Sequence, residues 1–248
     1  IVNYKVSINE KQTIDYSSQI GFPVAMKVLS NQILHKTETG GVELNIKNLD
    51  ELKISFQNLS DVFKKLKINS SDEKFLIQKM EKGISEIIVG YRVDELVGPI
   101  VVIGSGGILS EIYDDKSIRL APVDIKEAKK MIKEVKSLVT ITGYRGLPKA
   151  DINTIATAIV NMSKFAFVEE IKEAEINPLI VKKDNYGVVA VDGLITLYWF
   201  LFKQIWFEKK FIFTCLRIFL SLLNDNEFQM IINHGVRGSS PNPSQNYL

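Results

Sequence analysis

The chain has 248 residues, of which 46% are hydrophobic and 24% are charged. These are ordinary values for a globular protein, so they exclude wholesale disorder, a collagen-like chain and a small disulfide-stapled domain. The formal net charge of +2 is too small to favour nucleic acid as the main partner. We therefore expect small-molecule ligands.

Cysteine content and the start of the chain bear on the cellular compartment. Cys215 is the only cysteine, so an internal disulfide and a thiolate metal cluster are both excluded. The chain begins at Ile1 without a basic segment followed by an apolar one, which is not typical of a secretory signal. We expect a cytoplasmic protein.

Residues 197–248 differ in composition from the rest of the chain. They contain both tryptophans and the only cysteine, and the last residues are rich in Gly, Ser, Pro and Asn. We therefore divide the chain into a domain at 1–196 and an atypical tail at 197–248, helical at first and then disordered. The tail could be a helix that docks on a partner, an interfacial amphipathic helix, or an extension unrelated to the body. Charged residues interrupt its apolar run too often for a transmembrane span, namely Lys203, Glu208, Lys209, Lys210 and Arg217.

The body alternates patterns typical of helices and of strands, which predicts an α+β protein. We find no internal repeat. Helices are expected at 10–20 after a cap at Asn9, after Asn48 or Asp50, after Asp124 and after Asp151. Strands are expected at 22–29, 75–80, 86–92, 99–104, 118–122, 174–182 and 186–191.

The last two strands predict a hairpin that gathers oxygen ligands. A turn at Lys183–Asn185 places Asn177 opposite Asp192. Glu175 precedes Asn177 by two residues and therefore shares its face. Three hard oxygen ligands on one patch suit Mg²⁺. The alternative is a polar, solvated face of an edge hairpin.

Two basic side chains have a functional and an ordinary interpretation. Lys27 interrupts an apolar strand, either as a lysine that reaches out from a sheet edge or as a charge on nucleotide phosphates. His35 lies in a polar segment before Gly40 and Gly41, either as a surface side chain or as a base, ligand or phosphoryl acceptor.

Further candidates for phosphate binding follow along the chain. The glycines Gly104, Gly106 and Gly107 come after a strand, so they could cradle a phosphate with main-chain donors or form a tight turn. Arg119 and Arg145 could each clamp a phosphate or form an ordinary salt bridge.

Taken in order, these motifs resemble the ATP-grasp subunit of the ADP-forming acetyl-CoA synthetase family. The resemblance spans about residues 4–195. It is carried by Gly21–Lys27, Ile33–Lys36, Gly40–Val42, Gln78–Met80, Glu86–Gly90, Gly98-Pro99, the glycines at 104–107, Arg119–Pro122, Gly143–Gly146 and Glu175–Leu179.

The resemblance implies an ATP-grasp fold with two α/β subdomains that hold ATP or ADP and Mg²⁺ between them. In this family, a CoA-binding partner forms an acyl phosphate and takes the phosphoryl group on a histidine. The ATP-grasp part then transfers that group to ADP. This chain is similar only to the second part, so the resemblance implies a hetero-oligomer with a CoA-binding subunit.

The resemblance also implies residue roles. By it, Lys27 binds nucleotide phosphate, Glu81 and Glu86 lie along the hinge and ribose side, and Arg119 neutralises the transferring group. Asn177 and Asp192 would hold Mg²⁺, with Glu175 as a further ligand or as the residue that orients the histidine. His35 matches a second phosphohistidine that relays the group between two sites, while the glycines at 104, 106 and 107 and Arg145 would contact the nucleotide.

Other functions remain open at this point. The chain could be the nucleotide-binding part of a succinate-type CoA ligase or of a longer fused acyltransferase. It could also be a non-catalytic binding or assembly subunit. The family's usual helix ahead of Tyr4 is missing or is not included in this sequence, and an atypical tail follows Ile195.

Overall fold

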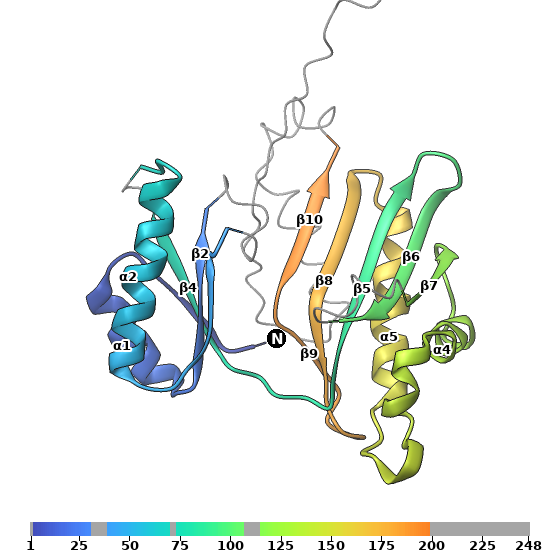
Figure 1. The fold of residues 1–248 in the computed structure, drawn as a ribbon. Coiled ribbons are helices and arrows are strands. Elements are labelled where there is room, and N and C mark those ends of the chain that lie inside the picture. Colours follow the sequence, from blue (N-terminus) through green and yellow to red (C-terminus); the bar gives the residue numbers. More distant parts are fainter. Residues whose placement is uncertain (1, 31–38, 70–72, 107–114, 199–248) are drawn as a thin grey trace, which may run out of the picture.

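The computed structural model describes residues 2–30, 39–69, 73–106 and 115–198 of the chain. These residues form two α/β subdomains that lie side by side and are connected by residues 80–84 (Figure 1). Each subdomain is built on one sheet. The predicted α+β class and the predicted division into two subdomains are confirmed.

The N-terminal subdomain is a four-stranded antiparallel sheet in the order β1-β4-β2-β3. Alternate residues of β2 and β4, among them Met26 and Ile77, pack with Leu59 and Phe63 of α2 in a buried core. The residues between them therefore point to the opposite face of the sheet. The elements are β1 (Tyr4–Ser7), α1 (Glu10–Ile20), β2 (Val24–Leu29), β3 (Val42–Ile46), α2 (Leu49–Lys65) and β4 (Lys74–Lys79).

The C-terminal subdomain is an antiparallel sheet in the order β10-β8-β5-β6-β7, with β9 also paired to β8. Its core includes Val89, Val101, Met131 and Ile159, from strands and from the two helices that cover one face. The elements are β5 (Ser85–Asp94), β6 (Gly98–Ser105), β7 (Lys116–Leu120), α4 (Ile125–Glu134), η2 (Lys136–Ile141), η3 (Tyr144–Gly146), α5 (Ile152–Ser163), η4 (Lys164–Phe167), β8 (Ile171–Val181), β9 (Val188–Ala190) and β10 (Gly193–Leu197).

The described α-helices begin where the sequence predicts. Asn9, Asp124 and Asp151 each accept a hydrogen bond from a backbone N–H three residues later, which satisfies one of the free donors of the first turn. Of the two candidates for α2, Asn48 is the cap, because its side chain accepts from the Glu51 backbone N–H.

The predicted hairpin has the expected register. Leu179 pairs with Ala190 and Val181 pairs with Val188, and the same register continues into β10, where Gly193 pairs with Ile176. Within this register Asn177 lies opposite Asp192, and the Asn177 N–H donates to the Asp192 carbonyl oxygen at 3.1 Å. The prediction that these two residues face each other is therefore confirmed.

The sequence pattern missed three strands, β1, β3 and β10. β3 has two exposed residues near its centre and β1 is only four residues long, so neither shows a run of alternating apolar residues. β10 continues to Leu197, one residue beyond the expected end of the first domain.

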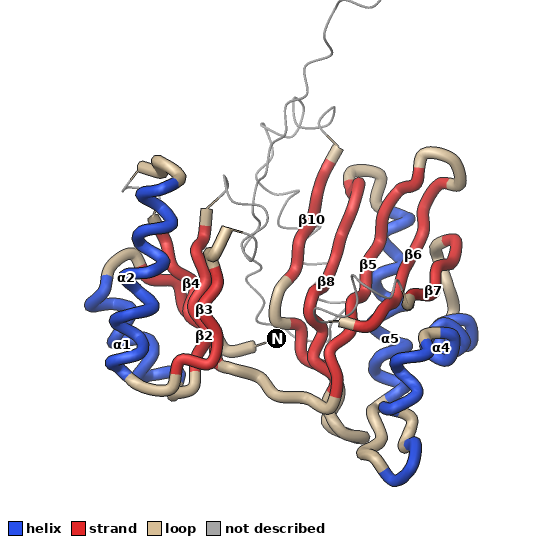
Figure 2. The backbone as a smooth tube through the Cα atoms, in the orientation of Figure 1, coloured by secondary structure: helices blue, strands red, loops and turns tan. Residues whose placement is uncertain are grey.

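The helices of both subdomains lie on the outer sides of the molecule, so the two sheets stand between them (Figure 2). In the N-terminal sheet, Lys27 and Gln78 alternate with core residues and therefore point away from α1 and α2. Both side chains contact the segment between β9 and β10 of the other subdomain. These contacts join the helix-free sides of the two sheets.

Within the described ranges, no helix is long and apolar enough to cross a bilayer. The predictions about the tail concern residues that lie outside the described part from residue 199 onward.

Candidate functional site

Lys27 is a buried cation at the junction of the two subdomains. The residue is 4% exposed, and its Nζ lies 2.9 Å from Oδ2 of Asp192. A buried ammonium group without a counter-charge costs several kcal/mol, and this carboxylate offsets that cost for Lys27. The first part of the site is therefore an ion pair between β2 and the segment before β10.

Asp192 is held at several atoms. Oδ1 accepts a hydrogen bond from the Gly193 N–H at 3.0 Å, and the backbone oxygen accepts from the Asn177 N–H at 3.1 Å. Together with Lys27 on Oδ2, these contacts fix both the backbone and the carboxylate. About one third of the side chain remains exposed, so the carboxylate can be reached from solvent.

Glu175 and Asn177 share the helix-free face of β8. Ala174 and Ile176 are buried against the helix side, so the alternating residues 175 and 177 point the other way. Glu175 is half-buried and pairs with Leu194 of β10, while Asn177 is exposed and faces Asp192. The three candidate metal ligands therefore occupy neighbouring positions, two on β8 and one in the segment just before β10.

This donor set is suitable for Mg²⁺. It offers two carboxylates and one amide, all hard oxygen donors, and Mg²⁺ usually takes only one or two protein carboxylates together with phosphates and water. In the described part of the chain, no group of three or more His, Cys, Asp and Glu side chains is placed to hold a metal. The set formed by β8 and the segment before β10 therefore suits a metal that arrives with a phosphate ligand better than a metal bound by protein alone.

Gly104 and Gly106 lie at the end of β6, which is separated from β10 by the two strands β8 and β5. Gly104 pairs with Ile88 of β5, and the Gly106 N–H donates to the Glu86 carbonyl oxygen at 2.7 Å. A Cβ on Gly106 would lie 2.9–3.1 Å from atoms of Glu86, so the close approach of the two chains requires glycine. Glu86 itself is exposed. These residues border the sheet face that carries Asn177.

Glu81 lies in the connecting segment between the subdomains. Its Oε2 accepts from Lys182 Nζ at 2.6 Å, and the same ammonium also donates to the Lys82 carbonyl oxygen. The hinge position that the resemblance implies for Glu81 agrees with this placement. Any contact with ribose stays a prediction.

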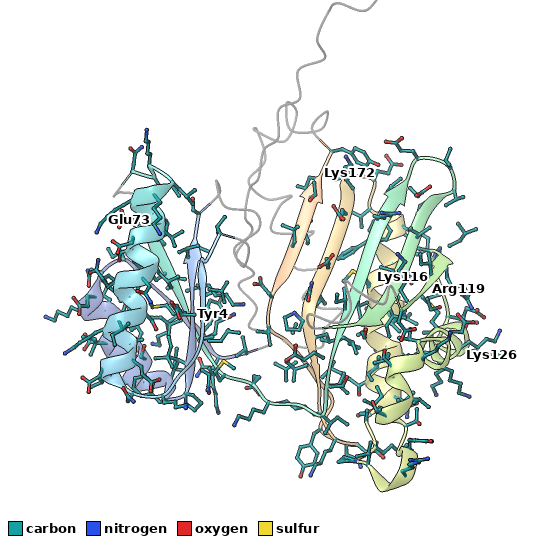
Figure 3. The ribbon with its side chains drawn as sticks, viewed as in Figure 1. Tyr4, Glu73, Lys116, Arg119, Lys126 and Lys172 are labelled. Carbon is teal, nitrogen blue, oxygen red and sulfur yellow. The ribbon has the colours of Figure 1, made fainter. Side chains whose placement is uncertain are left out.

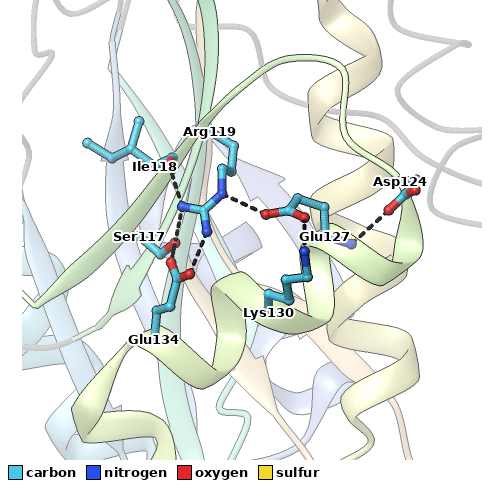
Figure 4. Close-up of polar contacts among 7 residues, drawn as sticks. All are labelled: Ser117, Ile118, Arg119, Asp124, Glu127, Lys130 and Glu134. Atoms are coloured by element: carbon cyan, nitrogen blue, oxygen red, sulfur yellow. Dashed lines mark hydrogen bonds and ion pairs between the residues drawn. The ribbon is translucent and has the colours of Figure 1, made fainter.

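Arg119 lies apart from these residues, on the helix-covered side of the edge strand β7. Its Nε donates to Glu127 at 2.8 Å and its Nη2 donates to Glu134 at 2.5 Å, both on α4 (Figure 4). Ser117, two residues earlier, also donates to Glu134. Figure 3 places Arg119 at the outer edge of the C-terminal subdomain, whereas Tyr4 marks the other subdomain. The structure does not bring Arg119 together with the metal ligands.

The ion pairs of Arg119 also set its electrostatics. Hydrogen bonds to Glu134 and then to Glu127 raise the pKa of the Arg119 guanidinium. The hydrogen bond from Arg119 and then that from Ser117 lower the pKa of Glu134. A guanidinium saturated by two carboxylates is an anchor for β7, so its predicted role at the transferring group finds no support in this arrangement.

Arg145 is exposed at the far end of the hairpin. It lies in η3 with a positive φ of 51°, and its guanidinium stands 5.3 Å from the Tyr144 ring centroid. The neighbouring bridge between Ala150 and Lys183 places this segment beside the hairpin turn. The structure does not bring Arg145 to Asp192. His35 and Gly107 lie outside the described residues, so their predicted roles stay predictions.

Two residues at the junction were given no role from the sequence. Gln78, which is 5% exposed, donates from Nε2 to the Val191 carbonyl oxygen at 3.0 Å. Lys182 anchors the connecting segment through Glu81. The signal for Gln78 was a polar side chain directly after the apolar run Phe75–Ile77, whereas a lysine after a strand, such as Lys182, gives no comparable signal.

Two subdomains face each other, with a buried lysine on one and oxygen ligands on the other, and this arrangement defines the class of protein. Residues 1–197 match the model of an ATP-grasp domain, so the chain belongs to the ATP-grasp domain family.

The related proteins narrow this class. Acetate–CoA ligase (ADP-forming) I subunit beta of Pyrococcus furiosus is 36% identical over 198 residues, covering 79% of this chain and 84% of that protein. Acetate–CoA ligase (ADP-forming) I of Archaeoglobus fulgidus is 36% identical over 190 residues, which are 76% of this chain but 28% of that longer protein. The chain therefore has nearly the extent of a separate beta subunit and about a quarter of the extent of a single-chain relative.

Solved structures agree with these relatives. Dinucleotide-forming acetyl-coenzyme A synthetase 1 of Candidatus Korarchaeum cryptofilum, with coenzyme A and Ca-AMPCP, has a TM-score of 0.72 and 33% identity, over 80% of this chain and 86% of that one. A second structure of that enzyme, with Mg-AMPPCP and a phosphohistidine segment pointing towards the nucleotide site, has a TM-score of 0.64 and 31% identity, with coverage of 80% and 85%. The predicted ATP-grasp fold and the predicted relation to ADP-forming acetyl-CoA synthetases are confirmed.

Proposed function

We propose that this chain is the nucleotide-handling subunit of an ADP-forming acid–CoA ligase, which moves a phosphoryl group between a phosphohistidine and ADP. The observation that carries the proposal is the 2.9 Å pair of buried Lys27 with Asp192, whose backbone faces Asn177 on the neighbouring strand. A cation and hard oxygen ligands meet there between two sheets, in a chain related to ADP-forming ligases.

Phosphoryl transfer asks the protein mainly for positioning and for neutralisation of charge. In the proposed reaction the P–N bond to imidazole breaks as a P–O bond forms to the terminal phosphate of ADP. Lys27 neutralises phosphate oxygens, because it is a cation fixed by its burial. Asn177, Asp192 and Glu175 hold Mg²⁺, which offsets the phosphate charge when it is bound. Gly106 lets the end of β6 approach Glu86 closely, and we assign Gly104 and Gly106 to the edge of the site that contacts the nucleotide.

The ion pair has a consequence for binding. Asp192 Oδ2 and Lys27 Nζ neutralise each other before any ligand arrives. A metal–nucleotide complex brings a cation for Asp192 and an anion for Lys27 together, so both groups exchange partners without either being left unpaired. We therefore expect the protein to bind Mg²⁺ much more tightly when ADP is present, and to bind ADP much more tightly when Mg²⁺ is present.

We also infer a partner and a compartment. Two relatives are named as beta subunits, which supports a hetero-oligomer with a CoA-binding subunit. That partner would select the acid, because the chain supplies only the nucleotide side. We infer that the assembly works in the cytoplasm, as its relation to enzymes of CoA metabolism and its lone cysteine suggest.

His35 is the proposed relay between the two active centres. The support is its resemblance-based position and the phosphohistidine segment named for one structural relative. In the relay, the imidazole nitrogen of His35 takes the phosphoryl group from the partner's histidine and passes it to ADP. The group moves intact, with one P–N bond broken for each bond formed.

The test uses the full chain with a CoA-binding subunit, ATP labelled on the γ-phosphate, and Mg²⁺. We expect acid-labile label on His35 in the wild type, located by mass spectrometry. We expect no label at this position in His35→Asn. His234→Asn is the matched control because these are the only two histidines, and it should label as the wild type does.

The outcomes separate the parts of the proposal. Wild-type chain that neither binds ADP with Mg²⁺ nor supports ATP formation would sink the proposed function. A different result would be normal turnover by His35→Asn while labelling of the assembly still requires Asp192. That result would replace the relay by direct transfer between the partner's histidine and ADP.

A further inference from the structure

Gln78 is a buried amide in the middle of the junction. It follows Phe75, Leu76 and Ile77 in β4, all of which are buried. Its register partner in β2 is Ala25, two residues before Lys27. Gln78 and Lys27 therefore lie on the same face of the N-terminal sheet, on neighbouring strands.

The amide makes one hydrogen bond, and that bond crosses between the subdomains. Gln78 Nε2 donates to the Val191 carbonyl oxygen at 3.0 Å. Because a carbonyl oxygen only accepts, the amide must present its NH₂ group there. Val191 directly precedes Asp192, so the N-terminal sheet holds this segment at two adjacent residues, by Gln78 on the backbone and by Lys27 on the carboxylate.

The other end of the same amide has no partner. Gln78 Oε1 is one of two buried side-chain atoms without a hydrogen bond in the described part of the chain, the second being Ser17 Oγ. An unsatisfied buried carbonyl costs about as much as, or more than, one hydrogen bond contributes. The amide therefore adds little or nothing to the net stability of the fold, and an apolar side chain of similar size would serve packing at least as well.

We propose that Gln78 is a positioning residue for the metal carboxylate Asp192. By fixing the Val191 carbonyl, Gln78 holds the Asp192 backbone in the position in which Oδ2 contacts Lys27 and the residue lies opposite Asn177. This inference rests on the proposed function, since it gives Asp192 a metal to bind. Partners that orient a metal ligand typically change metal affinity about 10–100-fold when they are removed.

The test compares Gln78→Met with the wild type in the full chain. Met keeps the length and the packing of Gln78 but cannot donate to Val191. The probe is Mn²⁺, titrated by its electron paramagnetic resonance signal in the presence of saturating ADP. We expect about ten-fold weaker Mn²⁺ binding in Gln78→Met, while its midpoint of thermal unfolding stays the same or rises.

Ser17→Ala is the matched control, because it removes the other unsatisfied buried atom from α1, on the helix side of the same sheet. We expect it to leave Mn²⁺ binding unchanged and thermal unfolding unchanged or slightly raised. A second check uses an Asp192→Asn background, in which Gln78→Met should weaken Mn²⁺ binding no further, because the two residues act through one ligand.

Each result decides between alternatives. Wild-type Mn²⁺ affinity in Gln78→Met would overturn this inference alone. A lowered unfolding midpoint, with ADP and Mn²⁺ binding reduced together, would also overturn it in favour of an ordinary structural role. Wild-type chain that fails to bind Mn²⁺ with ADP would overturn the proposed function as well.

Discussion

Two basic side chains in this chain meet carboxylates in opposite ways. Arg119 satisfies two glutamates of α4 from within its own subdomain, on the face that the helices cover. Lys27 meets a single carboxylate that belongs to the other subdomain, on the face that the helices leave open (Figure 1). The first contact ties local structure together, and the second places a charge where a ligand can take over one partner.

Substitution of Lys27 should have the largest effect and tests the difference between the two basic residues most directly. We expect Lys27→Met to lower kcat/KM for ATP formation about 10²–10³-fold, as the loss of one group that stabilises the transferring charge commonly does. Stability should change little, because the remaining Asp192 is one-third exposed and can be hydrated. Steady-state kinetics with ADP and urea unfolding measure the two effects. A large loss of stability with normal kinetics would contradict the proposed role.

Asp192→Ala should destabilise the fold clearly, unlike Lys27→Met. Lys27 is 4% exposed, so the substitution leaves a buried ammonium without a counter-charge, at about 3 kcal/mol of unfolding free energy. Urea unfolding measures this loss, and added ADP should restore part of it by supplying phosphate to Lys27. Equal losses in Lys27→Met and Asp192→Ala would contradict the asymmetric burial that distinguishes the two partners.

Arg119→Met tests the other half of the comparison. We expect a loss of about 1 kcal/mol in unfolding free energy, because the ion pairs are partly exposed and Glu127 and Glu134 are left beside each other. Affinity for ADP with Mg²⁺ should stay within about twofold of the wild type, since the guanidinium faces α4. A transfer rate that collapses at unchanged stability would return Arg119 to the catalytic role implied by the resemblance.

Acid should loosen the Arg119 contact gradually. Hydrogen bonds from Lys130 and then Arg119 lower the pKa of Glu127, and Arg119 lowers that of Glu134, both from an ordinary value of 4.5. A lowered folded-state pKa contributes stability above the unfolded value, and this contribution disappears as pH falls through the folded value. We expect the protection factors of β7 amides, which are corrected for the intrinsic pH dependence of hydrogen exchange, to fall below pH 4.5. The change should be smaller in Arg119→Met, where the pairing is already absent.

The sequence was sufficient for the elements and contacts that are local. Asparagine and aspartate caps predicted the helix starts, and the spacing of one hairpin predicted that Asn177 faces Asp192. Both depend on neighbours close in sequence, where turn geometry fixes the outcome. The face of Glu175 followed from the same alternation.

Contacts across the chain were beyond the sequence pattern. Lys27 and Asp192 are 165 positions apart, and nothing in either segment alone indicates that they pair. For Arg119, the sequence could not say which face of β7 it would take, and the deciding feature was the glutamates of α4. Gln78 was visible as a polar residue after an apolar run, but its role depends on Val191 in the other subdomain.

The short connection between the subdomains limits how they can move. At one end the Met80 N–H donates to the Pro23 carbonyl oxygen, and at the other the Ile84 N–H donates to that of Val181. A Cβ on Gly83 would lie 2.3 Å from the same Val181 oxygen, so the connecting segment packs directly against β8. Lys182 also donates hydrogen bonds to Glu81 and Lys82 in the middle of this segment, so only a few of its backbone dihedral angles are free to change. We therefore expect opening to be a small rotation about this connection, in which the nucleotide separates Lys27 from Asp192 while Gln78 keeps its contact with Val191.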